Sequence, residues 1–176
     1  SKGDKEIVSI LLSAKVNIDT INKKGETPLL IAVRSSSLDL TEKLLKGGAD
    51  ANRKGTLSFY TSPLTIATEA NNAALAELLI AYGATLADPE NPYGETPLHR
   101  AAIYGSKEVA ALLISKGASV DTKNDSSPLI LASERGHKEI VKMLLENGAE
   151  LERKKTHDYT ALALAAKEGH ADVVEL

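Results

Sequence analysis

Short stripes of Leu, Ile and Val recur along the chain at the spacing of one helix face, and a Gly follows four of them. Apolar residues three and four positions apart line one side of an α-helix. A Gly just past a helix end supplies the left-handed residue that closes it. The pattern therefore predicts four short amphipathic helices that end just before Gly48, Gly83, Gly117 and Gly148.

A second signature, Thr or Ser followed by Pro-Leu, precedes each of these stripes. Counted at the Pro, or at Ala161 in the last copy, successive copies lie 35, 34, 31 and 33 residues apart, which indicates a repeat array. A Thr or Ser hydroxyl caps a helix start, and Pro fits the first helical position. We therefore expect a helix after Thr27, Ser62, Thr96, Ser127 and Thr160.

An Ala stands four residues after each Pro, or after Ala161. A small side chain at one fixed position lets neighbouring helices approach closely. We therefore predict that these residues lie at contacts between repeats: Ala32, Ala67, Ala101, Ala132 and Ala165.

Thr96-Pro97-Leu98-His99-Arg100-Ala101, together with the later Leu113-Ile114 and Gly117-Ala118, resembles the ankyrin repeat family. The resemblance covers nearly the whole chain. It implies an all-α fold, an α-solenoid of helix-turn-helix units with projecting β-hairpin-like fingers. It also implies that partners bind the finger tips and the exposed ends of the first helices, on the concave side.

The copies form a single array over residues 1–176, and we expect this array to be a fragment of a longer protein. Full repeats span about 22–56, 57–90, 91–123 and 124–154, with partial repeats at 1–21 and 155–176. Residues Gly3 to Asp19 align without gaps on Gly105 to Asp121, so the first partial repeat is a second helix and its finger.

Charge and composition argue against several classes of function. A net charge of −3 provides no global field for a phosphate backbone, so we expect no nucleic-acid partner. The absence of Cys suits a reducing compartment, and no apolar run approaches the roughly 18 residues of a membrane span. We expect an intracellular, cytoplasmic protein with no membrane segment in this stretch, while its oligomeric state stays open.

No enzyme signature is present: the chain has no phosphate-binding Gly-rich motif, zinc-binding H-E-x-x-H or nucleophile elbow. We predict no catalytic residue, cofactor or metal. By the family resemblance, His99 bonds within a capping turn, and His137 and His170 bond to loop backbone. His157 lies at a predicted finger tip, exposed and free for a partner.

Aromatic residues mark the candidate binding surface, because exposed Tyr and Phe provide large rigid contact areas. By the resemblance, they fall at or beside family contact positions. The predicted partner-binding residues are Phe59, Tyr60, Tyr93, Ile103, Tyr104, Arg34, Glu69, Arg135, His157 and Tyr159. Phe59 and Tyr60 could instead fold back to anchor their own long finger.

These observations favour a non-catalytic scaffold or adaptor that binds a protein or peptide segment on its concave face. One alternative is a small-molecule or nucleotide sensor, in which a Tyr stacks on a base and Lys23, Lys24 or Arg34 meets phosphate. Another is a regulatory module of an enzyme or channel encoded outside this stretch.

Overall fold

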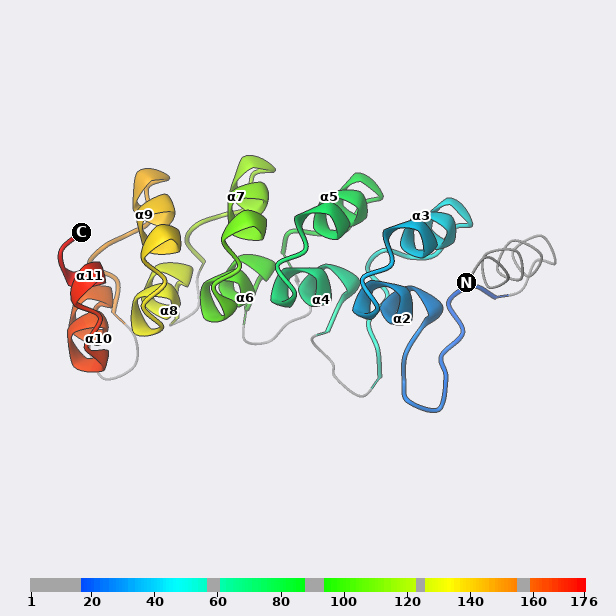
Figure 1. Cartoon of the computed structure of the whole chain (residues 1–176), viewed down its shortest axis with the longest axis horizontal. Coiled ribbons are helices and arrows are strands. Elements are labelled where there is room, and N and C mark those ends of the chain that lie inside the picture. The colour runs from blue at the N-terminus through cyan, green and yellow to red at the C-terminus, as the bar shows by residue number, and fades with distance from the viewer. Residues whose placement is uncertain (1–16, 57–60, 88–93, 123–125, 155–158) are drawn as a thin grey trace. The chain divides into compact units, whose positions relative to one another are not determined.

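The computed structural model describes residues 17–56, 61–87, 94–122, 126–154 and 159–176 (Figure 1). These residues contain helices and turns, and no strand is assigned among them, so the all-α prediction is confirmed. The helices are α2 (Pro28–Arg34), α3 (Leu38–Lys46), α4 (Pro63–Glu69), α5 (Ala73–Ala81), α6 (Pro97–Tyr104), α7 (Lys107–Ser115), α8 (Pro128–Glu134), α9 (Lys138–Glu146), α10 (Ala161–Glu168) and α11 (Ala171–Val174).

The first helix of each pair begins where the Thr/Ser-Pro signature predicts. The Thr27 hydroxyl accepts from the Leu30 N–H at 3.2 Å, and the Ser127 hydroxyl accepts from the Ile130 N–H at 3.3 Å. Thr160 caps α10 in the same way without a following Pro. Each hydroxyl satisfies one of the free N–H groups of a helix start.

The second helices end as expected at glycines in the left-handed conformation. Gly48, Gly83, Gly117 and Gly148 have φ of +93°, +88°, +88° and +84°. A Cβ at any of these four would meet nothing within 4 Å. The backbone dihedral, not the available space, therefore favours Gly at these positions.

Small and branched apolar residues build the core. The five alanines of the first helices are fully buried: Ala32, Ala67, Ala101, Ala132 and Ala165. Leu29, Leu64, Leu98 and Leu129, one position after each Pro, are also buried. This burial agrees with the predicted packing role of the small residue.

The chain divides into two compact units. One comprises Ser1–Ala67 with Ala74–Thr85, and the other Thr68–Ala73 with Leu86–Leu176. In the first unit α2 packs on α3. In the second, α6 packs on α8 and α8 on α10, while α7, α9 and α11 pair with the helices that precede them (Figure 1).

The finger before α2 contains a tight turn. The Asn22 N–H donates to the Glu26 carbonyl at 3.0 Å, and the Gly25 N–H donates to the Asn22 carbonyl at 2.9 Å. The Asn22 side chain also accepts from the backbone N–H groups of Lys24 and Glu26. These bonds fix the turn locally, as Asn side chains commonly do.

Candidate functional site

Six of the ten predicted binding residues lie in the described part of the chain. Phe59, Tyr60, Tyr93 and His157 lie outside the described residues, so their roles stay predictions. Tyr104, at the end of α6, is 51% exposed, and Ile103 beside it is half-buried.

Arg100, in α6, contacts both Glu69 and the Tyr104 ring, although it was not among the predicted binding residues. Its Nε donates to Glu69 Oε1 at 3.0 Å, and its Nη2 contacts the same oxygen. A second carboxylate, Glu95, lies 3.9 Å from Nη1. The guanidinium also stands over the Tyr104 ring, 5.4 Å from the ring centroid. We call Glu69, Glu95, Arg100, Ile103 and Tyr104 the Tyr104 patch.

The geometry of the Tyr104 patch restrains an exposed aromatic ring. A guanidinium within about 6 Å of a ring centroid is attracted to the ring face, by about 0.5–1 kcal/mol at exposed sites. Arg100 is itself restrained by Glu69, and the Arg100 and Glu69 side chains are both partly buried. The ring is therefore presented to solvent in a restricted set of orientations.

A second exposed aromatic has a similar cationic neighbour. Lys167 Nζ lies 5.5 Å from the Tyr159 ring centroid, and it is 3.6 Å from Glu168 Oε1. Tyr159 is 40% exposed. Tyr159 directly precedes the cap of α10, and Lys167 lies in the last turn of that helix. The Tyr159 ring, just before α10, thus lies beside a side chain from the last turn of the same helix.

Two predicted residues remain in the described part of the chain, Arg34 and Arg135. Arg34, in the first compact unit, pairs with Glu26 at 3.2 Å, which ties the end of α2 to the turn of its own finger. Arg135 follows α8 and is exposed. The structure therefore brings Glu69, Ile103 and Tyr104 together around Arg100.

His99 has the structural role that the resemblance implied. It is fully buried, and its Nδ1 accepts from the Thr96 N–H at 3.0 Å and lies 2.8 Å from the Thr96 hydroxyl. Because Nδ1 accepts, Nε2 carries the proton and donates to the Thr122 hydroxyl at 3.2 Å. The ring therefore joins the start of α6 to the segment after α7.

The resemblance implied that His137 and His170 bond to loop backbone, but both bond to carbonyls in the last turn of the preceding first helix. His137 Nε2 donates to the Ile103 carbonyl at 3.2 Å, and His170 Nε2 donates to the Glu134 carbonyl at 3.1 Å. The rings lie against Gly105 and Gly136, where an added Cβ would approach within 2.7 Å and 2.5 Å. Both histidines thus stabilise contacts between successive helix pairs.

Two side chains of the second helices have shifted pKa values, and in both the main cause is a hydrogen bond to a neighbouring side chain. Glu108, in the first turn of α7, accepts a hydrogen bond from the Asn71 amide, and this bond lowers the pKa of the Glu108 carboxyl. In α3, the hydrogen bond to Glu42 raises the pKa of Lys46.

Within the described residues no cluster of His, Asp and Glu could hold a metal ion, and no helix is long and apolar enough to cross a membrane.

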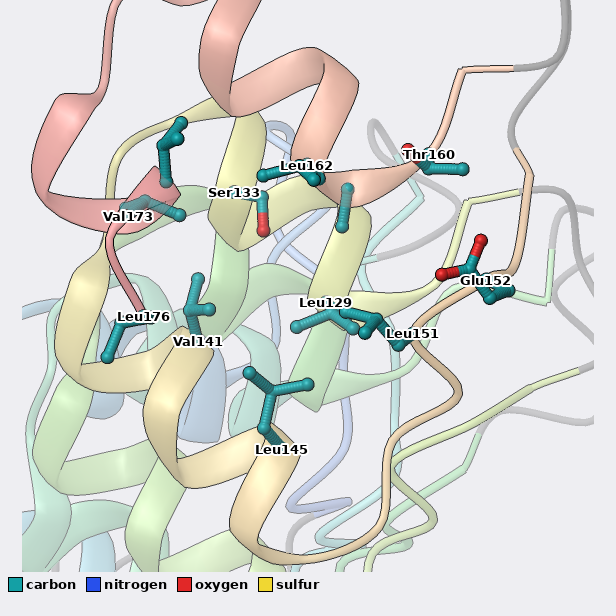
Figure 2. Close-up of a pocket in the computed structure, with 12 residues that line it drawn as sticks. Leu129, Ser133, Val141, Leu145, Leu151, Glu152, Thr160, Leu162, Val173 and Leu176 are labelled. Carbon is teal, nitrogen blue, oxygen red and sulfur yellow. The ribbon is translucent and has the colours of Figure 1, made fainter.

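An apolar pocket of about 310 Å³ lies among α8, α9, α10 and α11 (Figure 2). Its lining includes Leu129, Val141, Leu145, Leu151, Leu162, Val173 and Leu176, with Ser133, Glu152 and Thr160 as polar members.

Comparison with the other first helices explains the lining of this pocket. Leu162 is 55% exposed, whereas its counterparts Leu98 and Leu129 are at most 1% exposed. The pocket walls are thus positions that serve packing elsewhere in the chain, and its polar groups form no nucleophile–base arrangement.

Comparisons with known proteins agree with the repeat pattern. A family model described as "Ankyrin repeats (3 copies)" matches residues 1–55, 52–124 and 118–176. Together these matches span the chain from its first residue to its last.

Curated relatives share the pattern over part of their length. The chain is 37% identical over 126 residues to the nuclear factor NF-kappa-B p105 subunit of Mus musculus, covering 70% of this chain and 13% of that protein. It is 38% identical over 96 residues to ankyrin repeat and KH domain-containing protein 1 of Homo sapiens, covering 54% and 4%. It is 35% identical over 112 residues to human ankyrin repeat and SOCS box protein 11, covering 64% and 33%. The chain thus spans a third or less of each of these relatives.

Proposed function

Because the chain belongs to the ankyrin repeat family, whose repeats are generally protein-interaction modules, we propose that it is a non-catalytic protein-binding scaffold or adaptor. Its partner is another protein or peptide segment that docks on the first-helix ends and the fingers, on the concave face. The observation that carries this proposal is the Tyr104 patch, in which Arg100 and Glu69 hold an exposed Tyr ring.

Preorganisation supports the Tyr104 patch as the energetic centre of binding. A Tyr ring contributes a large contact area with few rotamers to immobilise, and binding hot spots are enriched in Tyr and Arg. Arg100 is already paired with Glu69, so little further conformational entropy is lost when a partner orders this side chain. A Tyr104 ring whose orientations are already restricted loses less conformational entropy on binding, so more of its contact energy appears as binding free energy.

The proposed surface extends along the second compact unit. The helices α6, α8 and α10 pack in succession, and their exposed ends carry Tyr104, Arg135 and the Tyr159–Lys167 pair. These groups offer a partner aromatic area together with positive charge. Phe59, Tyr60, Tyr93, His157 and Arg34 remain predicted contributors. The absence of Cys supports an intracellular, cytoplasmic setting.

Site-specific photo-crosslinking tests this function. A photoreactive residue at Arg135, on the proposed surface, is compared with one at Lys142, which is also exposed but lies on α9 of the same repeat. We expect a specific adduct from cell lysate at Arg135, absent at Lys142, that falls about thirtyfold in a Tyr104→Ala background.

Two results would count against the proposal. Equal adducts at both positions would show that the first-helix ends have no special role. A thermal shift with micromolar nucleotide that is lost in Tyr104→Ala, together with no adduct at Arg135, would favour a nucleotide sensor instead.

A further inference from the structure

Two neighbouring fingers of the first compact unit come into backbone contact. The Thr56 N–H donates to the Gly25 carbonyl at 2.9 Å. Gly55, beside Thr56, lies so close that an added Cβ would stand 2.7 Å from the Gly25 oxygen. A side chain at residue 55 would therefore press against backbone, which cannot move aside as a flexible side chain can. This contact holds the segments 22–25 and 53–56 together, and both belong to the first unit.

These two segments carry four cationic residues. Lys23 and Lys24 occupy the middle of the turn that precedes α2 (Figure 1), and Arg53 and Lys54 begin the second segment. Lys23, Lys24 and Arg53 are exposed, and within the described part of the chain none of the three forms an ion pair. Neither segment contains an acidic residue. We call Lys23, Lys24, Arg53 and Lys54 the basic finger surface.

The carboxylates of the same fingers are already engaged. Glu26 Oε1 accepts from Arg34 Nε at 3.2 Å, and Glu26 Oε2 accepts from the Asn22 amide at 3.5 Å. Both oxygens of Asp19 accept from the Asp50 N–H, at 3.2 Å and 3.4 Å. Asp50 Oδ1 in turn accepts from the backbone N–H two residues further along, at 2.8 Å. The bonds of these carboxylates therefore leave the positive charge of the basic finger surface available to a ligand.

We propose that the basic finger surface binds an acidic segment of a partner protein, a stretch rich in Glu and Asp. This inference rests on the proposed protein-binding function, and it names the chemistry that one part of the array recognises. Charge complementarity supports it, because exposed cations on segments that are already held together attract a run of carboxylates. The backbone contact between the segments also reduces the conformational entropy that is lost on binding.

A titration with a dye-labelled peptide of Glu and Gly residues, followed by fluorescence anisotropy, tests this inference on the whole chain. The double variant Lys23→Ala/Lys24→Ala is compared with Lys43→Ala/Lys46→Ala, which makes the same change in net charge on α3 of the same unit. We expect about fivefold weaker peptide binding for the first variant and a change within about twofold for the second. Wild-type binding should also weaken between about 0.1 M and about 1 M salt, because salt screens exposed charges.

Gly55→Ala tests whether the contact between the two fingers matters. This substitution changes no charge, but its Cβ would meet the Gly25 oxygen and separate the segments. We expect about threefold weaker peptide binding, with the helices retained by circular dichroism. If Gly55→Ala does not fold, Arg53→Ala serves instead, because it removes one cation from the second finger and should weaken binding about twofold. Unchanged binding in the folded variant would overturn the role of the second finger.

Three results would overturn the inference as a whole: no binding of the peptide, equal peptide affinities for the wild type and Lys23→Ala/Lys24→Ala, or tighter binding of single-stranded DNA of the same charge. With any of these, a specific adduct at Arg135 would still support the proposed function, because Arg135 lies in the second compact unit. Conversely, peptide binding that depends on Lys23 and Lys24, without an adduct at Arg135, would support the basic finger surface and count against the Tyr104 patch.

Discussion

Replacing Gly105 by Ala isolates the energy of one contact between helix pairs. Gly105 has φ of +72°, and a Cβ there would lie 2.7 Å from His137 Cε1 and 2.9 Å from Nδ1. An L-residue in the left-handed region costs about 1–2 kcal/mol. Moving the His137 ring also breaks its bond to the Ile103 carbonyl, at about 1 kcal/mol. We therefore expect Gly105→Ala to destabilise the protein by about 2–3 kcal/mol.

Gly117, at the end of α7 in the same repeat, provides the matched control. It has φ of +88° and nothing within 4 Å of an added Cβ, so Gly117→Ala should cost only the backbone term of about 1–2 kcal/mol. Urea denaturation followed by far-UV circular dichroism measures both free energies of unfolding. In a His137→Ala background the two substitutions should become equivalent. Equal costs in the wild type would refute the steric reasoning.

Three further predictions concern His99, Glu108 and Arg100. His99→Ala should cost about 3 kcal/mol, because it leaves a cavity and removes the acceptor of the Thr96 N–H. His99→Ile, which copies Ile130 in α8, should cost less in urea denaturation. The hydrogen bond from Asn71 lowers the pKa of the folded-state Glu108 carboxyl. This bond therefore stabilises the fold at pH values above the Glu pKa of the unfolded chain, about 4.3. The stabilisation is lost as the pH falls through the lower pKa of the folded state. Thermal melts should show that Asn71→Ala loses more stability at neutral pH than at pH about 3, whereas in a Glu108→Gln background the loss should not depend on pH. Arg100→Met should leave the melting temperature within a few degrees but broaden the motion of the Tyr104 ring in NMR relaxation; an unchanged ring would exclude Arg100 as its restraint.

The helices and their ends were predictable from sequence because their causes are local. A hydroxyl three residues before a free N–H, as at Thr27, fixes a helix start, and a left-handed Gly such as Gly48 fixes an end. Both depend on residues within one turn. The buried alanines followed from the repeat spacing alone.

The candidate site was less accessible to sequence reasoning. Arg100 and Glu69 are 31 residues apart and meet only in the folded chain. The one local signal was that Arg100 precedes Tyr104 by four residues, a spacing that puts both on one helix face. Asp19, Asn52 and Asp121 likewise accept from backbone N–H groups 31, 33 and 29 residues away, and these bonds became evident only from the structure.

The affinity of a crosslinked partner for two Tyr variants tests most directly whether the Tyr104 patch is the binding centre. Tyr82, at the end of α5, is 40% exposed and lies outside the patch, so Tyr82→Ala is a matched control for Tyr104→Ala. Isothermal titration calorimetry should give about thirtyfold weaker binding for Tyr104→Ala and a change within about twofold for Tyr82→Ala. Equal affinities for the two variants, with both folded by circular dichroism, would contradict the account.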